Sequence, residues 1–122
     1  MGAASFNRSY TRNERSSTLE KRFPDSSELF RVKAQTLTTS ENYFEAEQAF
    51  EESIAADEES EIALYSFTLF LLNELNDPDR ALTQAQRLSA LDHTHFAAQA
   101  LLASTLTRCG HFDDATKQYE KV

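Results

Sequence analysis

The stretch EAEQAF (residues 45–50) decides the fold, because two related stretches follow it at nearly constant intervals. They are RALTQA (80–85) and DATKQY (114–119). Each holds an alanine with an aromatic or small residue four positions later, and the alanines, Ala46, Ala81 and Ala115, are 35 and 34 residues apart. Such a period predicts tandem supersecondary units, none of which can bury its apolar face alone.

Helix signals surround each of these stretches. Apolar residues recur at helical spacing, as in Phe30, Ala34 and Leu37, and indicate helices with one buried face. Gly110 is expected to end a helix over 96–109. We therefore predict six helices in three antiparallel hairpins. The predicted N-terminal caps of the first five helices are Asp25, Asn42, Ser60, Asp77 and Thr94.

Composition agrees with an all-α domain. The chain has 122 residues, enough for one core, and only two glycines and two prolines, too few for the turns of an all-β fold. The most apolar stretch, IALYSFTLFLL (62–72), is too short to span a bilayer and is typical of a buried helix, so we expect no membrane partner.

Charge is unevenly distributed along the chain. Residues 1–27 hold five basic and three acidic residues, whereas the other 95 hold seven basic and seventeen acidic ones. An acidic body repels phosphate backbones, so we expect no nucleic-acid partner. The single cysteine, Cys109, excludes an internal disulfide and suits a reducing compartment, here taken as the cytoplasm.

The chain divides into a leader and a domain. Residues 1–24 are basic, rich in Ser, Thr, Asn and Arg and without period, which predicts a flexible tail, and 25–122 form the predicted domain. The run 41–61 holds nine acids and no base. We interpret it as a solvated helix face, with a docking face for a basic partner as the alternative, and residues 8–22 of this chain are one candidate for that partner.

No motif for catalysis or cofactor binding is recognisable. A phosphate loop, a nucleophile elbow and HExxH are all missing from the sequence. His93, His95 and His111 fall in interhelical turns, and a zinc site is conceivable there, but no carboxylate completes a known spacing, so polar turn residues are the favoured interpretation. We therefore expect no enzyme, metal or cofactor.

The three units resemble tetratricopeptide repeats, over about 27–61, 62–95 and 96–122. The family's aromatic in each first helix falls on Phe30, Tyr65 and Gln99, its buried alanine on Ala46, Ala81 and Ala115, and its following position on Phe50, Ala85 and Tyr119. Gln99 departs from the pattern, and the closing proline is missing from both complete repeats. The resemblance implies an all-α solenoid of three helical hairpins wound into a right-handed superhelix.

The resemblance also implies a concave groove lined by the first helices, which binds a peptide or helix of another protein. The family's basic clamp for a terminal carboxylate is mostly replaced here, so an apolar helix or extended segment is the expected ligand. Phe70 would be an exposed aromatic in this groove or, equally, a core residue. The corresponding positions are Arg31, Gln35, Ala63, Ser66, Phe70, Asn73, Ala97, Ala100, Ser104 and Arg108.

Two non-enzymatic functions follow from the resemblance. The first is a scaffold or adaptor module, and the alternative is a small free-standing assembly or secretion chaperone that holds an apolar helical subunit. The last repeat ends with Tyr119 and Val122 at positions where the family packs onward against another helix. We therefore also expect self-association through the last helix, most simply as a two-fold dimer.

Overall fold

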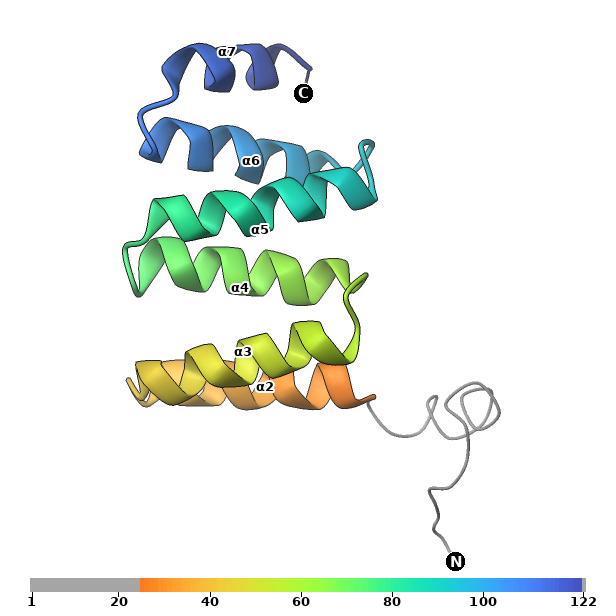
Figure 1. Ribbon diagram of the computed structural model, residues 1–122, viewed down its shortest axis with the longest axis vertical. Coiled ribbons are helices and arrows are strands. Elements are labelled where there is room, and N and C mark those ends of the chain that lie inside the picture. The colour runs from red at the N-terminus through yellow and green to blue at the C-terminus, as the bar shows by residue number, and fades with distance from the viewer. Residues whose placement is uncertain (1–24, 122) are drawn as a thin grey trace, which may run out of the picture.

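The expected helices form in the computed structural model, which describes residues 25–121 (Figure 1). Within that range the chain has six helices and no strand, and successive helices pack as antiparallel neighbours, so the predicted all-α arrangement of helical hairpins is confirmed. The helices are α2 (Ser26–Thr39), α3 (Tyr43–Ala56), α4 (Glu61–Asn73), α5 (Pro78–Leu91), α6 (Phe96–Arg108) and α7 (Phe112–Lys121). The predicted tail 1–24 and Val122 lie outside the described residues.

The turns within the three hairpins share one backbone feature. Glu41, Asn76 and Gly110 have φ values of 65°, 52° and 85°, the left-handed conformation that often ends a helix. These residues are 35 and 34 positions apart, the period seen in the sequence. In each turn the next N–H reaches back to a carbonyl near the end of the preceding helix, at 2.8 to 2.9 Å. The hairpins therefore repeat in backbone conformation as well as in sequence.

The two turns between hairpins also repeat. The carboxylates of Asp57 and Asp92 each accept a hydrogen bond from the N–H two residues on, at 3.1 and 2.9 Å. Hydrogen bonds from the hydroxyl and backbone N–H of Thr94 hold the pKa of Asp92 below its ordinary value. Ser60 and His95, three residues after each aspartate, then cap the following helices.

Four of the expected helix starts and ends are confirmed, and two caps are corrected. Asp25, Ser60 and Asp77 accept hydrogen bonds from the first turns of their helices, and the helix ending near Gly110 stops at Arg108.

The expectation for Thr94 was wrong, and the one for Asn42 is confirmed for its place at the start of α3 but not for a side-chain bond. The Asn42 side chain makes no cap bond and donates instead to the Ser40 hydroxyl at 2.9 Å. The cap of α6 is His95, whose Nδ1 accepts from the Ala98 N–H at 2.9 Å, while the Thr94 hydroxyl is bound to Asp92.

The core divides into two clusters of buried side chains. The larger one spans α2 to α6 and centres on Phe50, Phe67 and Phe70, with ring centroids 5.1 to 6.4 Å apart. The smaller one, between α5, α6 and α7, is made of Ala85, Leu102, Leu106 and Ala115. Ala46 and Ala81 are fully buried and Ala115 nearly so, as expected where a small side chain lets two helices approach.

The apolar stretch 62–72 forms most of α4, which buries seven residues between its neighbours. This confirms the interpretation of a buried helix, which ends at Asn73. Within residues 25–121 no helix is both long and apolar enough to cross a membrane.

Candidate functional site

A groove between α2 and α4 brings together four of the ten residues expected from the sequence. We call it the Ser66 groove, and its volume is about 290 Å³. Gln35, Ser66, Phe70 and Asn73 are the expected members. The whole lining is Gln35, Thr38, Thr39, Phe50, Ser66, Leu69, Phe70, Asn73 and Glu74.

The Ser66 groove has an aromatic floor and a polar rim. Phe50 and Phe70 are 2% and 3% exposed, so they form the floor and belong to the core. Of the two alternatives for Phe70, the core residue is therefore confirmed: its ring centroid lies 5.1 Å from that of Phe50 and 6.2 Å from that of Tyr43, edge to face. An all-round apolar helix such as α4 does not reveal from sequence which aromatic faces inward.

The rim offers unused hydrogen-bonding groups. Gln35 and Asn73 are exposed and Ser66 is half-buried, and none of these side chains makes a hydrogen bond within residues 25–121. A side-chain amide presents both donors and an acceptor, which matches the backbone of an extended peptide. The groove can thus pair with main-chain groups at its rim while an apolar side chain enters over the two rings.

One end of the groove is negative. A hydrogen bond to Glu74, followed by desolvation and the charges of Glu74 and Glu41, raises the pKa of Tyr43 above its ordinary value. The Tyr43 phenol therefore keeps its proton, and its ring holds Phe70 in place. A ligand entering from this end meets a carboxylate, which disfavours an acidic terminus there.

The other six expected residues are dispersed. Ala63 is fully buried and cannot contact a ligand, and Arg31 lies one turn before Gln35 on α2, with its Nη2 atom 3.8 Å from the Glu28 carboxylate. Ala97 and Ser104 are exposed and Ala100 half-buried along α6.

Arg108 has a different role from the expected one. Its Nη2 atom donates to the Leu72 carbonyl at 2.9 Å and to the Asn76 side chain at 3.0 Å, so it ties α6 to the turn between α4 and α5.

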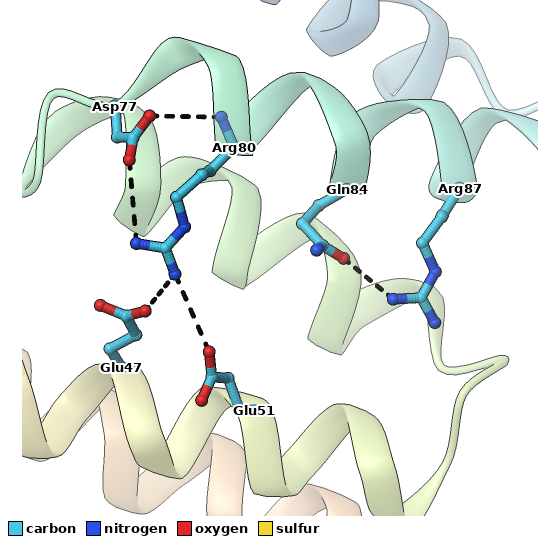
Figure 2. A network of polar contacts seen from close by, with 6 residues as sticks. All are labelled: Glu47, Glu51, Asp77, Arg80, Gln84 and Arg87. Atoms are coloured by element: carbon cyan, nitrogen blue, oxygen red, sulfur yellow. Dashed lines mark hydrogen bonds and ion pairs between the residues drawn. The ribbon is translucent and has the colours of Figure 1, made fainter.

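A second groove, between α3 and α5, was missed by the sequence reasoning. We call it the Arg87 groove; it also has a volume of about 290 Å³ and lies above the buried residues Phe67 and Leu71 of α4. Figure 2 shows its polar side chains reaching across the gap from both helices. Its full lining is Glu51, Ile54, Phe67, Leu71, Arg80, Gln84 and Arg87.

Charges are balanced at one end of the Arg87 groove only. Arg80 of α5 pairs with Glu47 across the gap, and its guanidinium also lies 3.8 Å from Glu51 and 3.7 Å from Asp77 (Figure 2). The hydrogen bond to Glu47 is the main cause that raises the pKa of Arg80. Arg87 contacts only Gln84, at 3.1 Å, among the groove's polar groups (Figure 2). The sequence does contain a signal for this groove. Glu47 and Arg80, which carry opposite charges, are 33 positions apart on the second helices of successive hairpins.

The remaining candidate groups do not converge. The described residues contain no group of three or more His, Cys, Asp or Glu side chains placed to hold a metal ion. His95 caps α6, and His111 lies in the turn between α6 and α7, 4.0 Å from the Asp114 carboxylate. Burial is the main cause that raises the pKa of the Cys109 thiol, with Asp79 adding to it, and the thiol donates to the Pro78 carbonyl. A thiol in this setting is a poor nucleophile.

Comparison with known proteins adds no family to this picture, because neither a protein-family model nor a curated protein matches the chain. The assignment of a function therefore depends on the geometry of the two grooves.

Proposed function

We propose that this chain is a non-catalytic protein-interaction module, a scaffold or adaptor of tetratricopeptide type, that binds a peptide or helix of a partner in the Ser66 groove. The observation that carries the proposal is the groove's construction: two buried aromatic rings below, and the free side-chain groups of Gln35, Ser66 and Asn73 above. This combination suits a segment that presents an apolar anchor and its own backbone.

Repetition of the backbone supports the tetratricopeptide resemblance within the proposal. The left-handed residue of each hairpin turn and the aspartate turn between hairpins recur at the period of the sequence repeat. The lone, half-buried thiol of Cys109 is consistent with the cytoplasm as the place of action.

A small assembly or secretion chaperone is the second candidate, favoured by the end of the helical stack. Tyr119 of α7 is 53% exposed, whereas the residues at the equivalent positions, Phe50 and Ala85, are 2% and 0% exposed. An apolar helical subunit could cover that ring. So could a second copy of the chain, and we propose self-association there in the absence of a partner.

The self-association is tested by sedimentation. We expect the wild-type chain to dimerise with increasing concentration, and Tyr119→Glu to shift it toward monomer while keeping its helical circular dichroism. A strict monomer for the wild type at high micromolar concentration would show that the α7 face needs no second copy.

The groove is tested by affinity capture from a lysate of the source organism, followed by mass spectrometry. Ser66→Arg should fill the groove and abolish capture of the specific partner. Ser104→Arg, an equal change on the exposed face of α6, should leave capture intact. Both variants are first checked for folding by circular dichroism. Equal capture by both would move the binding site away from the Ser66 groove.

A further inference from the structure

The first helix of the domain carries an apolar stripe that has no covering helix within residues 25–121. Leu29 and Val32, one turn apart on α2, are 57% and 46% exposed. We call this pair the α2 stripe. The residues at the same repeat positions are Leu64 and Phe67 of α4 and Ala98 and Leu101 of α6, with exposures of 0%, 3%, 0% and 8%.

The equivalent positions on α4 and α6 are buried in the same way. α4 packs against α3, and α6 packs against α5, so each first helix is covered by the helix directly before it in the chain. Phe50 of α3 stacks on Phe67 of α4, with ring centroids 5.6 Å apart. In both cases a four-residue turn, 57–60 or 92–95, joins the covering helix to the covered one.

The chain that directly precedes α2 is residues 1–24, long enough to supply the same cover. A segment 35 positions before α3, which spans 43–56, would occupy 8–21 and leave four residues, 22–25, before the α2 start at Ser26. Leu19 then takes the position of Ile54, which is buried at 7% exposure, and Arg15 takes the position of Phe50. The missing partner of the α2 stripe is thus available at the expected distance along the chain.

Charge points to the same occupant. The antiparallel packing of α2 and α3 places the start of α2 beside the end of α3, where the Ser53 hydroxyl donates to the Ser27 carbonyl at 2.6 Å. The end of the segment that lies nearest this corner in the same register holds Lys21 and Arg22, next to one acid, Glu20. The acidic, mostly exposed residues at this corner of the domain are Glu28, Glu52, Asp57, Glu58 and Glu59.

We propose that residues 8–22 dock on the α2 stripe of their own chain, with Leu19 against Leu29 and Val32 and the basic side chains of Lys21 and Arg22 toward the acidic corner. This intramolecular cap closes the N-terminal end of the helical stack. It is independent of the ligand of the Ser66 groove, because Gln35 and Ser66 line another face of α2 and α4.

Paramagnetic relaxation in the full-length chain tests the contact. The native thiol is removed by Cys109→Ser and a nitroxide is attached through Leu19→Cys. We expect the amide signals of residues 29–33 to be lost and to return when the nitroxide is reduced. A matched label at Glu120→Cys, on the opposite end of the stack, should leave those signals intact. Unchanged signals with the label at position 19 would overturn the proposal.

An experiment with mixed chains distinguishes docking within one chain from docking on a second copy. An isotope-labelled chain without nitroxide is combined with an unlabelled chain that carries the nitroxide at position 19 or 120. Signal loss at residues 29–33 in either mixture would assign the α2 stripe to a second copy and overturn the intramolecular contact. We expect no loss in both.

Hydrogen exchange of the chain with Cys109 intact provides a second test. Leu19→Asp should speed amide exchange at residues 29–33 severalfold at low salt, and less at high salt, where the charged contacts of the wild type are already screened. Ala3→Asp, the same charge change outside the docking segment, should have no effect. Equal exchange in Leu19→Asp and Ala3→Asp would contradict docking.

Discussion

The junction between the first two hairpins has a large side chain at a repeat position where the junction between the last two has a small one. Phe50 of α3 inserts a ring between α3 and α4, whereas Ala85 of α5 occupies the corresponding place against α6. Accordingly, α5 and α6 are in more extensive contact than α3 and α4, and Figure 1 shows the wider gap at the first junction. Side-chain size at one repeat position thus sets the spacing between hairpins.

The wider junction is where the grooves lie. The Ser66 groove has Phe50 and Phe70 in its lining, and the Arg87 groove has Phe67 and Ile54. The aromatic cluster therefore both stabilises the first two hairpins and holds α3 far enough from α4 to leave recesses on two faces. In this molecule the groove is therefore a consequence of core composition.

The largest effect is expected from Phe50→Ala. Its ring packs on Phe67 and Phe70, and deletion of a buried phenyl ring typically costs about 3–5 kcal/mol of unfolding free energy.

Ala81→Leu, which overfills a helix crossing, should cost about 1–3 kcal/mol of unfolding free energy. Denaturant unfolding checks both, and wild-type stability of Ala81→Leu would mean that the repeat register is wrong.

The second junction should depend more on hydrogen bonds. Gln99 stands where the first two repeats have an aromatic residue. Its side chain accepts from Ser89 at 3.0 Å and from Gln118 at 2.7 Å, and donates to the Asp92 carbonyl at 3.3 Å, so it joins α5, α6 and α7.

We predict that Gln99→Leu lowers the free energy of unfolding by about 1–3 kcal/mol, because buried Ser89 and Gln118 lose their partner. Thermal unfolding measures this loss. A stability gain on the apolar substitution would show that the network is dispensable and that the second junction accepts apolar packing like the first.

The two inter-hairpin turns give the smallest expected effect. Ser60 caps α4 and His95 caps α6 in turns of the same backbone conformation. His95→Ala and Ser60→Ala should each cost about 0.5–2 kcal/mol, and His95→Asn should retain most of the stability. If His95→Ala unfolds like the wild type in urea while Ser60→Ala does not, the imidazole is not an effective cap.

The sequence predicted more of the fold than of the site. Alanines at a fixed period, with Asp25, Ser60 and Asp77 as caps, identified the hairpins because helix crossings and helix starts leave local chemical signals. The cap at His95 was missed because histidine is an unusual cap and Thr94 beside it is a common one.

The site was only partly predictable, because it depends on how far apart the helices lie. The resemblance to tetratricopeptide repeats placed Gln35, Ser66 and Asn73 in one groove, and they do line one groove. It did not decide between the two alternatives for Phe70, predict that Arg108 binds the Leu72 carbonyl of α4, or find the Arg87 groove between helices that are separated in sequence. Those features follow from packing between hairpins, which no local pattern encodes.

The spacing of α3 and α4 in Phe50→Ala decides whether the Phe50 ring sets the distance between the first two hairpins. A crystal structure of this variant contains its own control, since the α5–α6 junction with Ala85 is unchanged. We predict that the α3 and α4 axes move closer together, toward the α5–α6 spacing, and that the Ser66 groove shrinks. If the two axes keep their wild-type distance and a cavity remains where the ring was, the aromatic cluster does not set the spacing, and the account of how the groove arises is contradicted.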